Sequence, residues 1–183
     1  MNAREGQMPP MQQIELAATC GVRVAVAESL TGGLLAGALV GVPGASRVFS
    51  GGVVAYDTFL KTSVLDVDAD LLAAVGPVDA EVAKQMARGV RRVCATPRSA
   101  GEVPTDAEIG LSTTGVAGPD PDPATGQAVG TVWIGVSSSR GERAVKLQAS
   151  GDRHQIRSQT VAAALREFTD ELLACEAQRS RPC

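Results

Sequence analysis

Two periodicities of apolar residues along the chain predict a succession of strands and helices. Short, mostly β-branched apolar runs are typical of strands, whereas apolar residues every three or four positions are typical of helices. The predicted strands are Val22–Val26, Val48–Tyr56, Glu108–Thr114, Gly130–Ser137 and Arg143–Gln148. The predicted helices are Met11–Cys20, residues 34–40, Ala80–Cys94 and Asp152–Leu173. Strands that alternate with helices and end in a hairpin and a last helix predict a single three-layer α/β/α domain with a mixed central sheet.

The ends of the chain and one internal segment do not fit this pattern. Residues 1–10 contain Gly6, Pro9 and Pro10 and are expected to form a disordered tail. The domain itself is expected to span residues 11–175, and the polar residues 176–183 are expected to fray. Residues 96–107 are rich in turn-forming residues, so we expect an exposed insertion there.

The junction between the first strand and the second helix, Glu28–Gly33, is the first candidate for chemistry. A strand that turns sharply into a helix exposes Ser29 at the edge of the sheet and leaves backbone N–H groups free for an anion. The alternative interpretation is that Ser29 or Thr31 only caps the helix and that Gly32 and Gly33 only permit the turn.

A second tight turn, Thr114–Pro119, follows the strand that begins near Glu108. Ligands of open α/β sheets bind where such turns meet at one edge, so this turn and the Ser29 turn are expected to face one another. In the loop that follows, Asp120 and Asp122 are interpreted as turn-forming carboxylates.

The strand Val48–Tyr56 contains Gly51 and Gly52, which need a reason because glycine weakens a strand. A ligand, a close neighbouring backbone or a bulge would each supply one. If the chain turns once after this strand, Tyr56 and Lys61 can lie near one edge of the sheet. The alternative makes Tyr56 a cover over the core and Lys61 a surface charge.

Composition excludes several classes of function. The net charge is −3 and aromatic residues make up 3% of the chain, which argues against a nucleic-acid-binding protein. Neither a signal peptide nor an apolar run long enough to span a membrane is evident, and the four cysteines are expected to be reduced in a cytoplasmic protein. A single histidine and widely spaced cysteines argue against a zinc site. Residues 66–70 imitate a calcium loop, but Leu71 and Pro77 occupy its required Gly and Glu positions.

The residues permit two mechanisms for a serine hydrolase. His154 is the only histidine, so a Ser-His-Asp triad would have to use it. Lys61 is the other candidate base, provided that its pKa falls by roughly 3 units below the value of a free lysine. N–H groups of the helix after Ser29 could hold an oxyanion. Arg153 and Arg157 lie one helical turn apart, and Arg157 is interpreted as a solvent-exposed charge.

Several separated segments resemble the CinA C-terminal domain family, whose members include nicotinamide-nucleotide amidohydrolases. These segments are AESLTGGLLAGALVGVPGAS, SGGVVAYDTFLKTSVLDV, STTGVAGPD, VGTVWIGV and GDRHQIRSQTVAAAL. The resemblance runs from Ile14 to Leu173, and the chain departs from it at residues 120–123, where family members more often carry extra glycines.

The resemblance implies an enzyme that converts nicotinamide mononucleotide and water to nicotinate mononucleotide and ammonia without a metal or organic cofactor. It implies Ser29 as nucleophile, Lys61 as general base and Tyr56 in support. The expected substrate-binding residues are Thr31, Gly32, Gly33, Thr114, Gly115 and Arg153. A catalytically silent nucleotide-binding module is the alternative. The expected partner is a small-molecule nucleotide and neither nucleic acid nor membrane, and the sequence allows a homo-oligomer.

Overall fold

A computed structural model describes residues 8–179, and five strands form one mixed sheet at its centre. The strands are β1 (Val24–Glu28), β2 (Phe49–Val54), β3 (Ile109–Gly115), β4 (Thr131–Ser138) and β5 (Gly141–Gln148), and their spatial order is β2-β1-β3-β4-β5. The first three strands in that order run parallel, and β4 and β5 run antiparallel to their neighbours. The mixed three-layer α/β fold predicted from the sequence is therefore confirmed.

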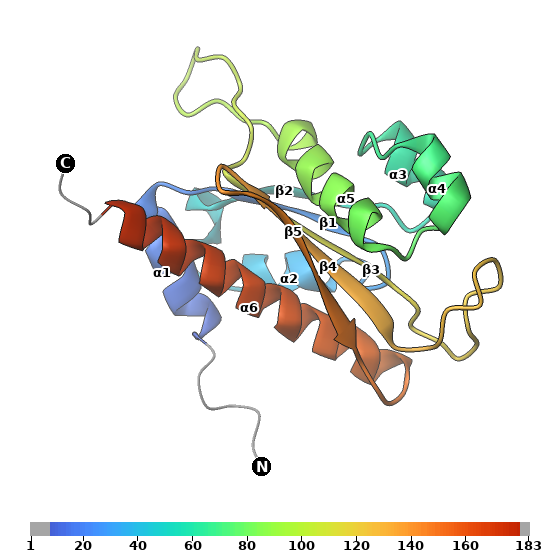
Figure 1. Ribbon diagram of the computed structural model, residues 1–183. Coiled ribbons are helices and arrows are strands. Elements are labelled where there is room, and N and C mark those ends of the chain that lie inside the picture. The colour runs from blue at the N-terminus through green and yellow to red at the C-terminus, as the bar shows by residue number, and fades with distance from the viewer. Residues whose placement is uncertain (1–7, 180–183) are drawn as a thin grey trace.

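Helices cover both faces of this sheet (Figure 1). One face carries α1 (Pro10–Cys20), α2 (Leu34–Val40) and the long α6 (Arg153–Arg179). The other face carries α5 (Ala80–Val93), with the short helices α3 (Thr58–Ser63) and α4 (Ala69–Val75) beside it. A 3₁₀ turn, η1 (Ala45–Arg47), leads into β2.

Burial on both faces explains why β1 is an almost continuous apolar run. Every residue of β1 is buried, because helices cover both sides of it, whereas β5 at the sheet edge is partly exposed along its length. On α5, Val82, Met86 and Val90 are buried at the spacing that the sequence predicts, but Val93 is 47% exposed. Val93 is the last residue of the helix, where the apolar stripe has passed the end of the core.

The parallel pairing fixes where a site can lie. Glu28, the last residue of β1, pairs with Val54 of β2 and Thr113 of β3, so the carboxyl ends of all three strands meet at one edge. The turn after β1, the turn into α3 and the turn after β3 therefore start side by side.

The glycines of β2 serve packing between strands and helices. A Cβ on Gly52 would lie 2.8 Å from a methyl group of Val26, and one on Gly51 would lie 3.2 Å from the sulfur of Cys94. The register also shifts between Val24 and Ala25 where they pair with β2. Of the three explanations considered above, close packing against neighbouring residues and a bulge-like shift of register account for these glycines.

The predicted ends need correction. The first helix begins at Pro10, a favourable position because the first turn of a helix needs no N–H at that residue. The last helix continues to Arg179, so residues 176–179 are helical and do not fray, and Arg179 donates a hydrogen bond to the carbonyl of Thr19. The remaining tail residues, 1–7 and 180–183, lie outside the described residues.

The loop before β3 is exposed at its tip, as predicted, and fixed at its base. Val103 is 81% exposed. Thr96 and Thr105 pair through two backbone hydrogen bonds, and the guanidinium of Arg23 donates to both of their carbonyl groups. Between residues 8 and 179, no helix has the length and apolar character needed to cross a membrane.

Candidate active site

The turn after β1 presents Ser29 at the carboxyl edge of the sheet. Its backbone N–H donates to the carbonyl of Thr113, which ties the turn to β3. Glu28, which precedes it, points its carboxylate under α2 and accepts hydrogen bonds of 2.8–3.0 Å from the N–H groups of Gly33, Leu35 and Ala36. This buried carboxylate stabilises the start of α2 by charge and by hydrogen bonding.

The position of Glu28 corrects the expectation that the N-terminus of this helix holds an oxyanion. Its N–H groups are already occupied, whereas those of Leu30 and Thr31 make no hydrogen bond within the described part of the chain. Leu30 lines the cavity in front of Ser29. The free N–H groups next to the serine therefore belong to the turn itself.

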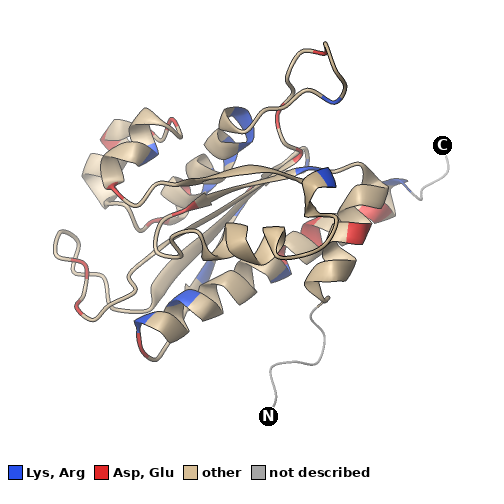
Figure 2. Cartoon of the chain, turned by 180° about the vertical axis from the view of Figure 1, so that it is seen from behind, with Lys and Arg blue, Asp and Glu red and all other residues tan. Residues whose placement is uncertain are grey.

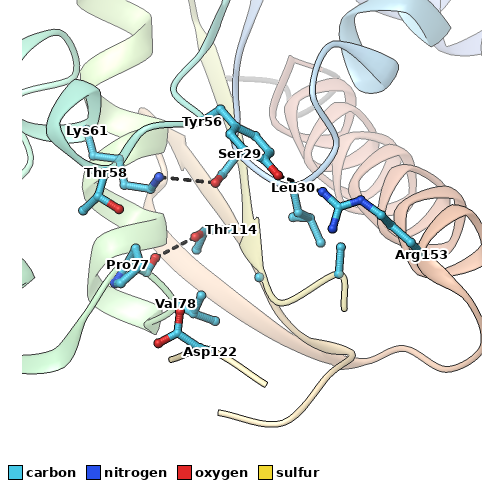
Figure 3. Close-up of a pocket in the computed structure, with 12 residues that line it drawn as sticks. Ser29, Leu30, Tyr56, Thr58, Lys61, Pro77, Val78, Thr114, Asp122 and Arg153 are labelled. Carbon is cyan, nitrogen blue, oxygen red and sulfur yellow. Dashed lines mark hydrogen bonds between the residues drawn. The ribbon is translucent and has the colours of Figure 1, made fainter. Parts of the chain in front are cut away.

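Lys61 reaches Ser29 from α3. Asp57 caps that helix by accepting from the N–H of Phe59, and one turn later the Lys61 side chain points back toward the sheet (Figure 3). The Nζ atom lies 3.3 Å from Ser29 Oγ and donates to the carbonyl of Ala55 at 2.9 Å. Lys61 is 1% exposed, so the interpretation as a surface charge is wrong.

Burial changes the acidity of this amine. Removal of the ammonium ion from water lowers the pKa of Lys61 from 10.5 to about 8, although the carboxylate of Asp57 acts in the opposite direction. A large fraction of the amine is therefore neutral at mildly alkaline pH, which a general base requires.

Tyr56 and Arg153 form the opposite wall of the cavity (Figure 3). Arg153 donates 2.7 Å hydrogen bonds to the Tyr56 hydroxyl and to the carbonyl of Gly118. Tyr56 is 60% exposed, and within the described residues its hydroxyl makes no hydrogen bond to Lys61. The lysine is held by Ser29 and Ala55 instead.

The cavity has a volume of about 200 Å³ and contains six of the nine site residues expected from the sequence. Those six are Ser29, Tyr56, Lys61, Thr114, Gly115 and Arg153. Thr114 donates a 2.6 Å hydrogen bond to the carbonyl of Pro77, and a Cβ on Gly115 would lie 2.8 Å from the carbonyl oxygen of Thr131. Gly115 is therefore required by the close approach of β4.

The other three expected residues, Thr31, Gly32 and Gly33, do not line the cavity. The Thr31 hydroxyl is buried against that of Thr113 at 2.7 Å. Gly32 and Gly33 have φ angles of 57° and 94°, which favour glycine, and they make the turn into α2. For these three residues the alternative interpretation, a structural role in the turn, agrees with the geometry.

Sequence reasoning missed six lining residues. They are Leu30, Thr58, Pro77, Val78, Ala117 and Asp122. Asp122 accepts hydrogen bonds from Ala124 and Thr125, as expected of a turn-forming carboxylate, and these bonds lower its pKa. No local pattern shows that this turn folds over the edge of the sheet, because its position depends on the strands on either side.

Arg157 corrects a second expectation. Its guanidinium is half-buried and donates to the carbonyls of Leu30 and Thr31 at 2.9 and 2.8 Å, so it clamps the serine turn from α6. The spacing of Arg153 and Arg157 is the feature of the sequence that could have indicated this role, since two arginines one turn apart share a helix face. His154, between them, is exposed and does not line the cavity.

Within residues 8–179, no three His, Cys, Asp or Glu side chains are grouped so as to hold a metal ion. The polar groups of the cavity are instead two cations, hydroxyls and one carboxylate. In Figure 2, basic and acidic residues are spread over many elements of the fold.

These features define a small α/β protein in which a buried lysine lies against a half-buried serine at the carboxyl edge of the parallel strands. The chain belongs to the CinA C-terminal domain family, which matches residues 11–172. It is 48% identical over 143 residues to a CinA-like protein of Frankia casuarinae, and this match covers 78% of the chain and 30% of the relative. It is 39% identical over 145 residues to a CinA-like protein of Acidobacterium capsulatum, with 79% and 32% of the two chains covered.

Solved structures of CinA proteins have a similar fold. A CinA superfamily protein of Klebsiella pneumoniae has a TM-score of 0.79 at 27% identity, with 90% of this chain and 96% of that chain covered. The competence/damage inducible protein CihA of Agrobacterium tumefaciens has a TM-score of 0.74 at 30% identity, with 94% and 99% covered. The chain thus spans nearly all of these structures but about a third of the curated relatives.

Proposed function

We propose that this protein is an amidohydrolase that converts nicotinamide mononucleotide and water to nicotinate mononucleotide and ammonia. The observation that carries the proposal is the 3.3 Å approach of a buried lysine amine, with a pKa of about 8, to the hydroxyl of Ser29. A serine beside a lysine of lowered pKa is one of the known arrangements that activate a hydroxyl nucleophile.

The chemistry can be assigned to these groups. Neutral Lys61 accepts the proton of Ser29 as Oγ attacks the amide carbon, and the carbonyl oxygen becomes an oxyanion near the N–H groups of Leu30 and Thr31. The C–N bond then breaks as protonated Lys61 donates its proton to the leaving nitrogen, which releases ammonia and leaves an ester on Ser29.

Water resolves the ester. Lys61, neutral again, accepts a proton from the attacking water, and the bond between the acyl carbon and Oγ breaks as the proton returns to Ser29. The second product forms as the carboxylic acid, and its proton passes to the released ammonia or to water to give the carboxylate. Ser29 and Lys61 thus act in both halves of the reaction, and no redox step or external acid is needed.

The nucleotide part of the substrate is supported by the opposite wall. Arg153 keeps a cationic group beside the cavity, and the hydroxyl of Tyr56 lies next to it. A guanidinium is well suited to the phosphate of a mononucleotide. This assignment, together with the family resemblance, favours nicotinamide mononucleotide over a simple amide.

Ammonia release from nicotinamide mononucleotide by the purified protein tests the proposal, with nicotinamide riboside and nicotinamide as comparison substrates. Ser29→Ala should lose several orders of magnitude in kcat and keep its fold, whereas Ser63→Ala, an exposed serine of α3, is the matched control and should keep full activity. Saturable nucleotide binding without ammonia release would favour the catalytically silent binding module instead.

A further inference from the structure

A second cavity lies at the opposite edge of the sheet. It has a volume of about 390 Å³, and it is built where β1 and β2 begin, with the base of the 96–105 loop beside it. Arg23 and Ser29 flank β1, so at about 3.3 Å per residue the two cavities are separated by about 20 Å along the sheet. The proposed reaction leaves this second cavity without a role.

Three arginines, Arg23, Arg47 and Arg98, line this cavity, and one carboxylate balances them. Glu108 pairs with both Arg23, at 3.8 Å, and Arg98. Within residues 8–179, the guanidinium of Arg47 forms neither an ion pair nor a hydrogen bond, and this side chain is exposed. Three guanidinium groups against one carboxylate leave two uncompensated positive charges.

Unsatisfied polar atoms also lie around this cavity. Arg23 is 9% exposed and its Nη atoms are used by Thr96 and Thr105. Its Nε is the atom that lies 3.8 Å from the Glu108 carboxylate, too far for a hydrogen bond, and it makes none in the part of the chain that the structure describes. The Oγ of Ser50 is likewise buried without a partner there. Buried polar groups are nearly always hydrogen-bonded, so two such atoms beside one cationic cavity indicate a missing acceptor.

We propose that this arginine pocket binds a phosphomonoester. A phosphate monoester carries close to two negative charges at neutral pH and presents three acceptor oxygens, which matches the excess charge and the free donors. Phe49, Val48 and Pro97 supply an apolar side to the cavity, where the organic part of the ligand packs. The proposal does not depend on amidohydrolase activity.

The base of the pocket is preorganised. Arg23 is held by the two threonines of the loop, and its backbone N–H donates to Glu108 at 2.7 Å. Arg98 is held by Glu108 and by the carbonyl of Gly21 at 3.0 Å. Only Arg47 has to move to close on a ligand, which keeps the entropic cost of binding low.

Titration of the ¹⁵N-labelled protein with ribose 5-phosphate tests this proposal, with ribose as the uncharged control. Backbone amide signals of residues 46–50 and of Thr96 and Arg98 should shift in a saturable manner, and ribose should have no effect. Arg47→Gln should weaken binding by at least about tenfold, the scale of a lost hydrogen bond to a charged group. Arg88→Gln, which removes an arginine paired with Glu142 elsewhere on the surface, should change it by less than about twofold.

Two further variants separate this pocket from the cavity at Ser29. Arg153→Gln should leave the shifts at residues 46–50 unchanged. Glu108→Gln should strengthen binding, because it removes the negative charge that competes for the arginines while its amide oxygen still accepts hydrogen bonds, and misfolding would not produce such a gain. The proposal is overturned if ribose 5-phosphate causes no saturable shifts at millimolar concentration, or if all shifts disappear in Arg153→Gln and persist in Arg47→Gln.

Discussion

The amine of Lys61 lies 3.3 Å from the hydroxyl of Ser29, although 32 residues separate them in the chain. Two features of the fold produce this contact. Parallel pairing of β1 with β2 brings their carboxyl ends to one edge, and the Asp57 cap then starts α3 so that Lys61 falls on its inner face. The carbonyl of Ala55 holds the amine in place at 2.9 Å.

Arg157 should be a positioning residue for the serine turn. Replacement by Met removes two hydrogen bonds to the carbonyls of Leu30 and Thr31 but keeps much of the apolar stem. We expect kcat to fall by about tenfold or more, because a small displacement of the turn misaligns the nucleophile, and KM to change little. Steady-state kinetics of Arg157→Met and of the exposed control Arg166→Met measure this. Equal effects in the two variants would assign Arg157 a role in solubility or general stability only.

His154→Ala should leave activity within about twofold of the wild type. The side chain is exposed and does not line the cavity, whereas the amine of Lys61 lies 3.3 Å from the hydroxyl of Ser29. Removal of a general base costs about 10² to 10⁴ in rate, so the kcat of this variant separates the two mechanisms clearly. A decrease of that size would support a histidine-based triad.

Much of the fold was predictable because its signals are local. An apolar run marks β1 as a strand buried on both faces, and Asp57, Asp68 and Asp79 cap helices in the positions where such residues are favoured. Helix ends were less accurate, since the continuation of α6 to Arg179 depends on contact with α1, which the sequence of α6 does not reveal.

The site was predictable only as far as its residues lie next to strand ends. Ser29 follows β1, Tyr56 follows β2 and Thr114 lies near the end of β3, so topology alone brings them to one edge. The roles of Glu28 and Arg157 were missed because both depend on what their long side chains reach: the N–H groups of α2 in one case, and two carbonyls from a helix 127 residues away in the other. Long-range contacts of this kind have no local pattern.

The buried amine should also make stability depend on pH in a particular direction. The pKa of Lys61 is about 8 in the folded protein and near 10.5 when unfolded, so between these values the unfolded chain binds more protons. The contribution of Lys61 to the free energy of unfolding therefore rises with pH from 8 to 10.5. A shift of this size corresponds to about 3 kcal/mol.

Denaturant unfolding of the wild type and Lys61→Met at pH 7 to 10.5 measures this contribution. Other groups titrate in both proteins, so the difference between the two curves isolates the lysine. We expect that difference to change by about 2–3 kcal/mol in favour of the wild type as pH rises. The difference in unfolding free energy at any single pH does not test this prediction, because Met also leaves the carbonyl of Ala55 without its hydrogen-bond donor. If the difference stays constant with pH, then folding does not change the pKa of Lys61.

Kinetics of the same variant test the catalytic role of the lysine. Lys61→Met keeps the bulk of the stem and removes the amine, so kcat for ammonia release should fall by at least about 10²-fold while KM changes less. In the wild type, kcat/KM should rise with pH through an apparent pKa of about 8, because only the neutral amine accepts the proton of Ser29. This rise should be absent in the variant.

Lys84→Met is the matched control for that experiment, because Lys84 is a surface lysine of α5 paired with Glu81. It should reproduce both the rate and the pH profile of the wild type. If Lys61 only attracted the phosphate of the substrate, KM of Lys61→Met would rise and its kcat would persist. Its kcat/KM would then still rise with pH as in the wild type. Full activity of Lys61→Met, with an unchanged dependence of kcat/KM on pH, would show that Lys61 is not the base for Ser29. Among the described residues that line the cavity, no other amine and no imidazole is present to take that role.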